Sequence, residues 1–290
     1  MMEVTQQLAA GFVNGCIYGM LALALVMIYR ATNHVNFAQG EMAMFSTYVA
    51  WTLTQAGLPY GVAALGAIAF GFITGALVER VALRPLHDAP VLAVVTVFVA
   101  LMVILQSAAG LLFGHETRNV DSPFAGWNGL GHAVLSGHAI GTLAVTLVVL
   151  AAMSAFFKFT RMGLAMRAAA LNAHSARLSG VDVDRVLMLG WGIAGAIGGV
   201  AGLLAAPVVF LNPHMMGGIM IYGFAAAVLG GIDSPPGAIV GGLLLGMGEN
   251  LLGAYVTGNE LKLTIALTVM FAILVVRPRG LLGGKVAQRV

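Results

Sequence analysis

The sequence is poor in charged residues and in cysteine. Only 9% of its 290 residues are Asp, Glu, Lys or Arg, whereas 60% are hydrophobic, and the mean hydropathy is +0.96. Because a soluble domain has about 25% charged residues, this composition excludes an ordinary soluble protein and predicts a polytopic membrane protein. The single cysteine, Cys16, excludes an internal disulfide bond and any metal site built from several cysteines.

The sequence also lacks the Gly-x-x-x-x-Gly-Lys-Ser/Thr loop that binds nucleotide phosphates. The nearest match, Gly283-Gly284-Lys285-Val286, has neither the earlier glycine nor the hydroxyl residue. The histidines, among them His115, His132 and His138, show no metal-ligand spacing, and no nucleophile, base and orienting group can be assembled. We therefore expect no catalytic residue, no metal site and no cofactor in this chain; if it takes part in transport that is powered by ATP, ATP and Mg would be bound by partner subunits.

Long apolar stretches dominate what is present. Several approach the roughly 20 residues that a helix needs to cross a bilayer, whereas Met42 to Gln55 and Ile219 to Ile232 are short for a crossing. The sequence therefore predicts an all-α protein with one transmembrane domain over residues 1–290 and about nine membrane segments, within a range of about eight to ten. The longer stretches are Leu8 to Tyr29, Tyr60 to Val78, Val91 to Phe113, Ile140 to Phe157, Val186 to Leu211, Ala238 to Val256 and, shortest of these, Leu263 to Val276.

Basic residues predict the orientation of these segments. If about nine segments alternate from an outside N-terminus, all of the 14 Lys and Arg residues except Arg118 and Lys262 fall on one side, as the positive-inside rule requires. We therefore predict an outside N-terminus and a cytoplasmic C-terminus. Because the basic residues flank apolar segments and form no single patch, the net charge of +3 predicts contact with a lipid bilayer and no nucleic-acid partner.

Polar residues and glycines interrupt the apolar sequence before each of the two short segments. The first interruption is Asn36-Phe37-Ala38-Gln39-Gly40-Glu41 and the second is Asn212 to Gly218. Such backbone is tolerated within a bilayer only where it faces protein or a wet cavity. Interrupted segments at matching places in two oppositely oriented halves are typical of an inverted-repeat transporter with its path at the repeat interface. Asn36, Gln39, Glu41 and Asn212 are therefore candidate residues of a translocation path; the alternative is that they merely end helices.

Glycines at every fourth position predict close helix packing. Gly11, Gly15 and Gly19 have this spacing, as do Gly237 and Gly241. Small residues on one face of a helix let another backbone approach closely. We interpret these glycines as contacts within the chain and not as a specific dimer motif.

The loop from Lys158 to Arg185 is the longest stretch on the predicted cytoplasmic side. Its Ala-rich middle, Met162 to Leu178, predicts one short amphipathic helix at the membrane surface, and Gly180 is placed as a helix C-cap. Two functions remain open for this loop: a connector at the interface, or the docking element of a cytoplasmic partner.

Glu41 and Glu249 are the acidic residues most closely associated with apolar sequence. A carboxylate in a membrane segment is a functional candidate, so either residue could be the proton or cation site of a secondary transporter. Each also lies next to Asn or Gln in the sequence, which favours a hydrogen-bonded structural role equally well.

Short motifs are spread over nearly the whole chain: Asn14-Gly15-x-x-x-Gly19-Met20-Leu21-Ala22-Leu23, Asn36-Phe37-Ala38-Gln39-Gly40-Glu41-Met42, Glu79-Arg80, Arg84-Pro85, Thr160-Arg161-Met162-Gly163, Ala176-x-Leu178-x-Gly180-Val181-Asp182, Asp184-Arg185-Val186, Asn212-Pro213, Ala225-Ala226-Ala227-Val228-Leu229-Gly230-Gly231 and Pro236-Gly237-Ala238-x-x-Gly241-Gly242. Together they resemble the membrane subunits of bacterial ATP-binding-cassette (ABC) importers for branched-chain amino acids, the LivH-type permeases.

The resemblance implies a permease of the bacterial inner membrane, with a periplasmic N-terminus, that works with several partners. These are a second, related permease subunit in a heterodimer, two cytoplasmic ATPase subunits and a periplasmic amino-acid-binding protein. It also implies that Met162 to Val181 is the coupling segment in a groove of the ATPase, with Arg167, Asn172, Arg177 and Gly180 as candidate coupling residues. Leu171-Asn172 stands where some relatives carry an acidic pair.

Related permeases move urea, short amides or other small solutes, so these are alternative substrates to branched-chain amino acids. Two other functions are alternatives to an ABC permease. The first is a secondary carrier or channel that works alone and uses Glu41 or Glu249 as its ion site, and the second, which the sequence supports less, is a structural scaffold.

Overall fold

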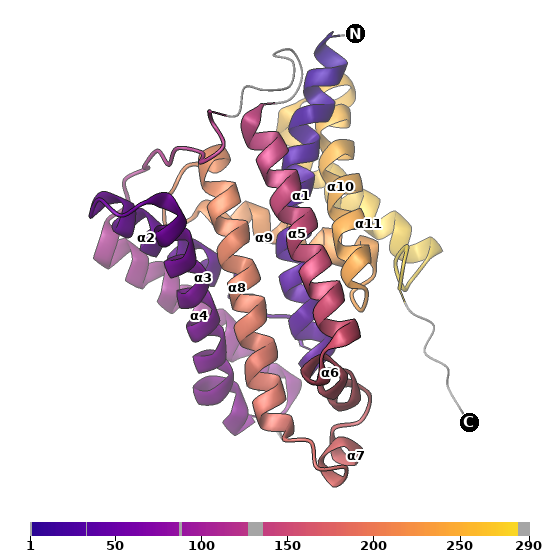
Figure 1. The fold of residues 1–290 in the computed structure, drawn as a ribbon. Coiled ribbons are helices and arrows are strands. Elements are labelled where there is room, and N and C mark those ends of the chain that lie inside the picture. The colour runs from indigo at the N-terminus through magenta and orange to yellow at the C-terminus, as the bar shows by residue number, and fades with distance from the viewer. Residues whose placement is uncertain (1, 33, 87–88, 127–135, 284–290) are drawn as a thin grey trace.

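The computed structural model describes residues 2–32, 34–86, 89–126 and 136–283, and its regular elements there are all helices (Figure 1). Lys285 and Arg289 of the basic tail, Gly284 to Val286 and His132 lie outside the described residues. The long helices are α1 (Met2–Thr32), α3 (Tyr60–Leu77), α4 (Val91–Phe113), α5 (Gly137–Phe159), α8 (Val183–Val209) and α10 (Pro235–Leu252). The shorter ones are α2 (Gln39–Gln55), α6 (Arg161–Leu171), α7 (Ala173–Leu178), α9 (Met215–Gly230) and α11 (Lys262–Val276).

Several π and 3-10 turns extend these helices. The π-helical turn Val78–Leu83 and the 3-10 turn Arg84–Leu86 continue α3, and the π-helical turn Gly253–Thr257 continues α10. With these extensions, six helices of the described chain are long and apolar enough to cross a membrane. The prediction of an all-helical, polytopic membrane protein is therefore confirmed.

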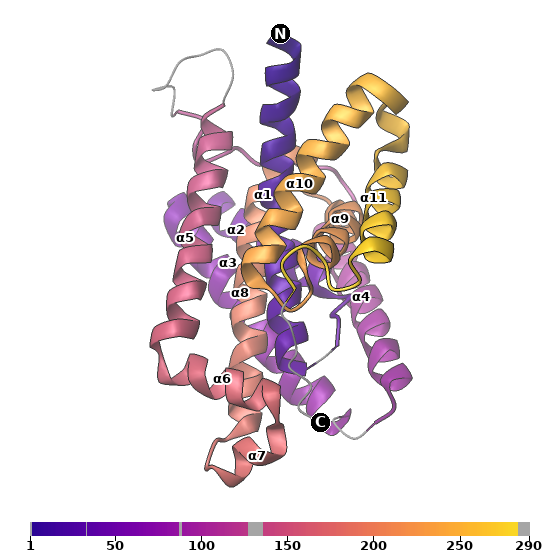
Figure 2. The same ribbon diagram turned by 90° about the vertical axis from the view of Figure 1, so that its right-hand side faces the viewer.

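Helix α1 runs through the middle of the bundle, whereas α4 and α5 lie at its periphery (Figures 1 and 2). The most apolar window of the first span is 89% buried, against 11% for α4 and 17% for α5. Large side chains such as Leu92 and Leu111 of α4 are exposed, as expected of a helix that faces lipid. A helix that is apolar on all sides, such as α1, is stable only when it is enclosed.

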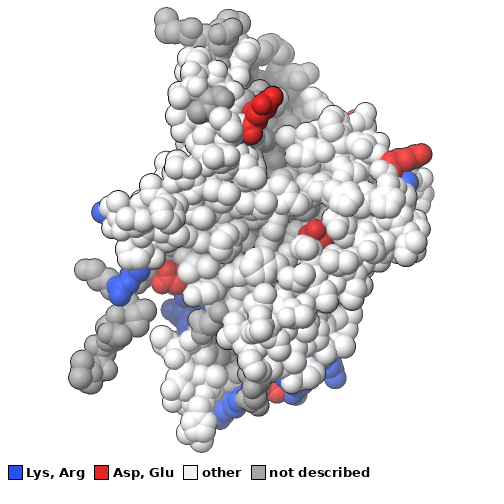
Figure 3. All heavy atoms as spheres, turned by 180° about the vertical axis from the view of Figure 1, so that it is seen from behind, with Lys and Arg blue, Asp and Glu red and all other residues white. Residues whose placement is uncertain are grey.

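Charged side chains gather toward the ends of the molecule. Figure 3 shows most of the basic side chains in the lower half of one face, whereas few charged side chains interrupt the white surface above them. Figures 1 and 2 place α6 and α7 at this lower end, opposite the start of α1. This distribution is the one that a bilayer imposes, because a charge in hydrocarbon is costly.

Glycines bring α1 and α10 into backbone contact. A Cβ placed on Gly246 would lie 2.3 Å from the backbone nitrogen of Gly15, and one on Gly11 would lie 2.7 Å from the carbonyl oxygen of Gly246. Gly19 meets the backbone of Ile239 in the same seam, at 3.1 Å from its Cα. The structure thus places Gly11, Gly15 and Gly19 at one intramolecular contact, which no larger side chain would permit at this separation.

The predicted packing glycines of α10 serve a different neighbour. A Cβ on Gly237 would lie 2.4 Å from the carbonyl oxygen of Gly230, and one on Gly241 would lie 2.2 Å from that of Ala226. Both contacts are made to α9. Glycines on two faces of α10 therefore let it pack closely against both α1 and α9. A third seam joins α3 to α8, where a Cβ on Gly75 would lie 2.2 Å from the carbonyl oxygen of Trp191.

The prediction of one amphipathic helix over Met162 to Leu178 is wrong, because the segment forms two helices, α6 and α7. Asn172 separates them with extended backbone (φ −159°, ψ 101°), and its side-chain oxygen accepts a hydrogen bond from the backbone N–H of Ser175 at 2.9 Å. A short polar side chain that caps the next helix competes with continued helix formation.

The predicted C-cap at Gly180 is confirmed. Gly180 has φ +82°, its N–H donates to the carbonyl of Arg177 at 3.0 Å, and the N–H of Val181 donates to that of Ala176 at 3.0 Å. This pair of bonds is a Schellman motif, which favours glycine because the left-handed conformation penalises a Cβ.

Substitution Gly246→Ala tests the α1–α10 seam. The added methyl group would overlap the backbone of Gly15, so we expect the free energy of unfolding to fall by about 1–3 kcal/mol and the melting temperature of the purified permease to fall with it. Gly248→Ala on the same helix is the matched control, because a Cβ there has no neighbour within 4 Å among the described residues. Equal melting temperatures for the two variants would contradict the seam.

Candidate translocation site and cytoplasmic helices

The predicted interruption Asn36–Glu41 is only partly non-helical, because α2 already begins at Gln39; residues 34–38 form the link before it, and the amide side chains of Asn36 and Gln39 are fully buried. Asn36 and Gln39 are both 0% exposed. The side-chain oxygen of Asn36 accepts a hydrogen bond from the backbone N–H of Ala38 at 3.0 Å, which turns the chain into α2. The link therefore supplies its own hydrogen-bond partners, as interrupted backbone within a bilayer must.

Gln39 connects this link to α8. Its Nε2 donates to the carbonyl oxygen of Ala194 at 2.9 Å, and its Oε1 accepts from Asn36 Nδ2 at 3.1 Å. Room for the amide exists because Gly198 stands one turn further along α8, where a Cβ would lie 2.4 Å from the Gln39 Nε2. Since Ala194 lies near the middle of α8, the link is held at mid-depth in the bundle.

Glu41 and Gly40 begin α2 beside the second interrupted segment. Glu41 is 4% exposed, and a Cβ on Gly40 would lie 3.3 Å from the Cβ of Met216, in the first turn of α9. The helices that follow the two interruptions therefore touch each other near their starts. The sequence predicted two related interruptions, and the structure brings the elements behind them together.

The second interruption is anchored by the segment that follows α4. Leu211 and Arg118 exchange two backbone hydrogen bonds of 2.9 Å each. Asn212, which is half-buried, accepts the backbone N–H of His214 at 2.9 Å through its side-chain oxygen. Phe210 just before it has φ +61°, the one non-glycine residue with a positive φ among those described, so the chain reverses sharply here.

Arg118 is a site residue that the sequence interpretation missed. Its guanidinium carbon lies 4.0 Å from the ring centroid of Trp51 in α2, and its Nη2 donates to the carbonyl oxygen of Phe113 at 2.5 Å. Through these contacts it ties the second interruption to α2 and α4. One signal was present in the sequence: Arg118 is one of two basic residues on the predicted outer side, which is otherwise free of them.

Glu249 is held in a hydrogen-bonded cluster between helices. The Tyr18 hydroxyl donates to its Oε1 at 2.8 Å, and the Tyr18 ring stacks on that of Tyr222 at 4.8 Å. The neighbouring Asn250 accepts a hydrogen bond from Lys262 Nζ at 2.8 Å. Through this oxygen the carboxyl group joins α1 to α10, as the structural alternative requires, whereas its Oε2 is buried and makes no hydrogen bond to a described residue. Among the described residues, no cluster of His, Cys, Asp or Glu could hold a metal ion.

A charge network joins α7 to the rest of the bundle. Asp184, at the start of α8, accepts hydrogen bonds from Arg177 at 3.0 Å and from Arg84 at the end of the α3 extension. The network therefore bridges three elements. Because its side chains are about 29–54% exposed, each pair contributes little to stability, but together they fix the position of α7 relative to α3 and α8.

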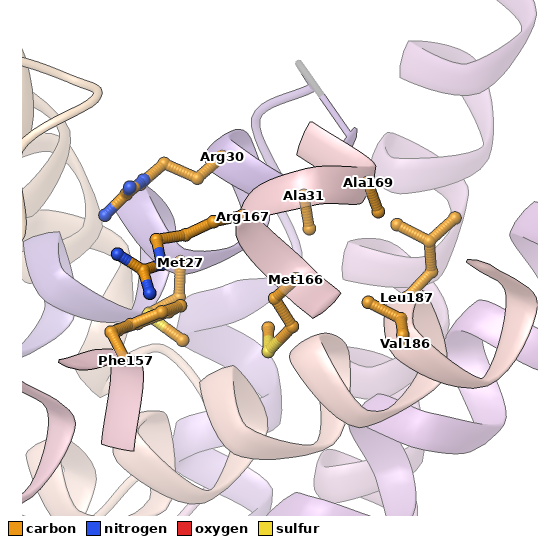
Figure 4. A pocket seen from close by; sticks show the side chains of 9 residues that line it. All are labelled: Met27, Arg30, Ala31, Phe157, Met166, Arg167, Ala169, Val186 and Leu187. Atoms are coloured by element: carbon orange, nitrogen blue, oxygen red, sulfur yellow. The ribbon is translucent and has the colours of Figure 1, made fainter. Parts of the chain in front are cut away.

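Helix α6 rests on the end of α1. Figure 4 shows Arg30 and Arg167 near each other on the Phe157 side of a small pocket, away from Val186 and Leu187. Arg30 lies 5.3 Å above the Phe157 ring, whereas Arg167 is exposed. The pocket has a volume of only about 10 Å³, so it is a packing gap filled by Met27 and Met166 and not a ligand site.

Comparison with known proteins gives consistent matches along the chain. The family model described as "Branched-chain amino acid transport system / permease component" matches residues 7–274. The chain is 33% identical to the high-affinity branched-chain amino acid transport system permease protein LivH of Escherichia coli (strain K12), over 98% of this chain and 97% of that protein. It is 32% identical to the permease protein BraD of Pseudomonas aeruginosa over the same shares of the two chains.

One solved structure has a similar fold. PsaBC from Streptococcus pneumoniae, in complex with a Fab, superposes with a TM-score of 0.51 and 13% sequence identity, covering 93% of this chain and 91% of that one. At this identity the likeness concerns the fold alone.

Substitution Gln39→Leu tests the link at mid-depth. It leaves Asn36 Nδ2 and the Ala194 carbonyl without their partner, so we expect a loss of about 1–3 kcal/mol in the free energy of unfolding, seen as a lower melting temperature in detergent. Gln55→Leu, at the exposed end of the same helix, is the control and should melt as the wild type does. If the Gln39→Leu protein were as stable as the wild type, the Gln39 amide would not stabilise the link between α1 and α2.

Proposed function

This chain belongs to the family of branched-chain amino acid transport system permease components, and on that premise we propose that it is the membrane-spanning subunit of an ABC importer for aliphatic amino acids such as leucine, isoleucine and valine. The observation that carries the proposal is the match over 98% of the chain to permeases of that transport class. Urea, short amides and other small solutes are the alternative cargo.

The membrane topology of the proposed permease has about nine crossings. The six long helices would each cross, and α2, α9 and α11 would complete the bundle. At 1.5 Å per residue, α2 and α9 are only about 24–26 Å long, shorter than the roughly 30 Å hydrocarbon core, which suits helices that begin inside the bilayer. The basic residues around α6 and α7, opposite the start of α1, support a periplasmic N-terminus and a cytoplasmic C-terminus.

The two interrupted segments have the arrangement expected of an inverted repeat. In each, a long helix (α1 or α8) is followed by a non-helical link and a short helix (α2 or α9). The contact of Gly40 with Met216 supports a translocation path that passes the starts of both short helices. Asn36 and Gln39 would hold the first link in place, whereas Glu41 and Asn212 would face the solute more directly.

Both short helices begin without a side-chain cap. The N-cap residues, Ala38 for α2 and His214 for α9, make no side-chain hydrogen bond to the first turn. Their backbone N–H groups and helix dipoles could transiently solvate the carboxylate of an amino acid, and Glu41 could attract its ammonium group. The apolar walls would tolerate the aliphatic side chain.

The importer would take its energy from cytoplasmic partners. Two ATPase subunits would bind ATP and Mg, a second permease subunit would complete the membrane unit as a heterodimer, and a periplasmic protein would deliver the solute. Helices α6 and α7 would dock on the ATPase, with Arg167 exposed to it and Asn172 and Gly180 shaping the two-helix turn. The Arg177–Asp184–Arg84 network would then carry movement of α7 into α3 and α8.

Reconstitution in liposomes tests the class of transporter. The complete importer with its binding protein should take up labelled leucine only when ATP is inside the vesicles, because ATP hydrolysis by the partner subunits would drive transport. The permease alone should be inert under proton and sodium gradients. Uptake by the permease alone on an ion gradient would favour the secondary carrier.

Variants of the interrupted segments test the path within the same vesicles. Asn212→Ala should slow ATP-driven leucine uptake because it frees the turn before α9. Asn36→Ala should do so more strongly, by at least about fivefold, since it removes a buried bond to Gln39. Normal uptake rates in both variants would place the path elsewhere.

Charge reversal tests the coupling helices. Arg167→Glu together with Arg177→Glu removes one exposed cation and sets a carboxylate against Asp184, so we expect leucine-stimulated ATP hydrolysis to fall by at least about fivefold or the ATPase to dissociate. Arg185→Glu is the matched control, because Arg185 pairs only with Asp182 in its own first turn among the described residues. Unchanged ATP hydrolysis in the double variant would make the loop a simple connector.

A further inference from the structure

The corner between α5 and α6 is held by contacts on both of its sides. Helix α5 ends at Phe159 and α6 begins at Arg161, and Figure 2 shows α6 turning from the lower end of α5 across the end of the molecule. The Thr160 hydroxyl between them donates to the carbonyl oxygen of Phe156 at 2.6 Å and accepts the backbone N–H of Gly163 at 2.9 Å. A Cβ on Gly163 would lie 2.4 Å from that carbonyl oxygen, so the two helices meet in backbone contact.

This corner lies at the depth of the lipid headgroups. Helix α5 has 23 residues, which at 1.5 Å per residue is about 35 Å, slightly more than the roughly 30 Å hydrocarbon core. Its most apolar window is only 17% buried, so the helix faces lipid along most of its length. A lipid-facing helix of this length ends where the hydrocarbon meets the headgroups, and α6 begins there.

Two exposed cations stand at the corner, and the chain has no carboxylate close to them in sequence. Lys158 and Arg161 are both exposed. The Arg161 guanidinium makes no hydrogen bond, ion pair or ring contact with any described residue, and the Lys158 ammonium lies 5.3 Å from the centroid of the Phe159 ring. No Asp or Glu occurs between Asp121 and Asp182. The corner therefore attracts an anion from outside the chain.

Large apolar side chains are exposed beside these cations. Phe159 is 76% exposed and Leu164 is 60% exposed. Because Leu164 follows Arg161 by three residues, these two side chains lie on the same face of α6. Exposed apolar side chains next to cations are typical of helices in the membrane interface, where the apolar groups enter the acyl region and the cations reach the lipid phosphates. We call Lys158, Phe159, Arg161 and Leu164 the corner patch.

The corner patch is separate from the cation of α6 that is proposed to face the ATPase. Arg167 follows Arg161 by six residues, which at about 100° per residue places it about 120° around the helix. Figure 4 shows Arg167 beside Arg30, which belongs to α1 and not to the corner. Helix α6 can therefore present Arg161 to lipid and Arg167 to a protein partner at the same time.

We infer that the corner patch binds the phosphate of an anionic phospholipid of the phosphatidylglycerol type, and that this contact holds the start of α6 at the membrane surface. The Lys158 ammonium and the Arg161 guanidinium donate to the phosphate oxygens, and the acyl chains pack on Phe159 and Leu164. A zwitterionic phospholipid binds less tightly, because its own ammonium group is repelled by the two cations. Only the effect on transport rests on the proposed function; the binding itself does not.

Lipid titration of the purified permease in a neutral detergent, followed by native mass spectrometry, tests the binding. Phosphatidylglycerol should bind at least about fivefold more tightly than phosphatidylcholine with the same acyl chains, since each cation near an anionic lipid contributes about that factor. Glycerophosphoglycerol, which is the same headgroup without acyl chains, should not compete at equal concentration. Competition by it would show a site for a soluble phosphate ester and would overturn the lipid as ligand.

Variants of the corner patch test which residues recognise the lipid. Arg161→Gln should weaken phosphatidylglycerol binding by at least about fivefold, the double variant Lys158→Gln and Arg161→Gln should lose the preference over phosphatidylcholine, and Arg161→Lys should keep it. Arg185→Gln is the matched control, because Arg185 is also an exposed arginine in the first turn of a helix but is paired with Asp182. The preference should persist in this control.

The effect on α6 is measured with the complete importer in vesicles that contain ATP. ATP-driven leucine uptake should be faster in vesicles of phosphatidylcholine with phosphatidylglycerol than in phosphatidylcholine alone, and the Lys158→Gln and Arg161→Gln double variant should lose this difference. Equal uptake rates of the wild type in the two kinds of vesicle would overturn the role assigned to the lipid contact.

The outcomes separate this inference from the proposed function. A preference for phosphatidylglycerol that depends on Arg161, in an importer that takes up no leucine, supports the site and overturns the proposed cargo. Normal leucine uptake together with equal affinities for the two lipids overturns the inference and leaves the proposed function standing. An equal loss of preference in Arg185→Gln also overturns it, as does dissociation of the ATPase from the double variant in detergent without lipid, because the corner patch would then be a protein contact.

Discussion

The structure depends on one constraint: every polar backbone group within hydrocarbon needs a partner inside the protein. Two segments interrupt their helices in this chain, and they meet this need in different ways. Asn36 supplies local partners for the backbone of Ala38 and Gln39, while the Gln39 side chain fastens the link to the Ala194 carbonyl of α8. In the second interruption, the backbone of Leu211 pairs with Arg118 of the segment after α4.

Glycine makes these partners reachable. The seams between α1 and α10, α9 and α10, and α3 and α8 are all backbone-to-backbone contacts. Because glycine has no side chain, the neighbouring helices can approach α1 closely and enclose it. Gly198 of α8 likewise leaves the space that the Gln39 amide occupies. Small residues therefore do more than pack the bundle: they set the depth at which the interrupted backbone is held.

Helices α6 and α7 are held to the bundle by two kinds of contact. Ionic contacts that are partly exposed and centred on Asp184 tie α7 to α3 and α8, so each contributes modestly to stability, whereas α6 packs through buried side chains such as Met166 and Ala169.

The sequence by itself determined the elements that depend on local composition. Apolar runs located the helices and Gly180 marked the end of α7, because hydrophobicity and backbone freedom are properties of neighbouring residues. The two predicted interruptions, Asn36–Glu41 and Asn212–Gly218, were too long, since α2 already begins at Gln39 and α9 at Met215. The division of the predicted surface helix at Asn172 was missed, since its helix-favouring neighbours outweighed one capping residue.

Only the tertiary structure decided which residues meet. In the structure, Gly237 and Gly241 pack against α9, and Arg118 pairs with the second interruption. The Gln39 side chain donates to the Ala194 carbonyl, and Glu249 accepts a hydrogen bond from Tyr18. Most of these partners are separated by many residues in the chain, and all of the contacts arise from the packing of whole helices, so no local pattern could specify them.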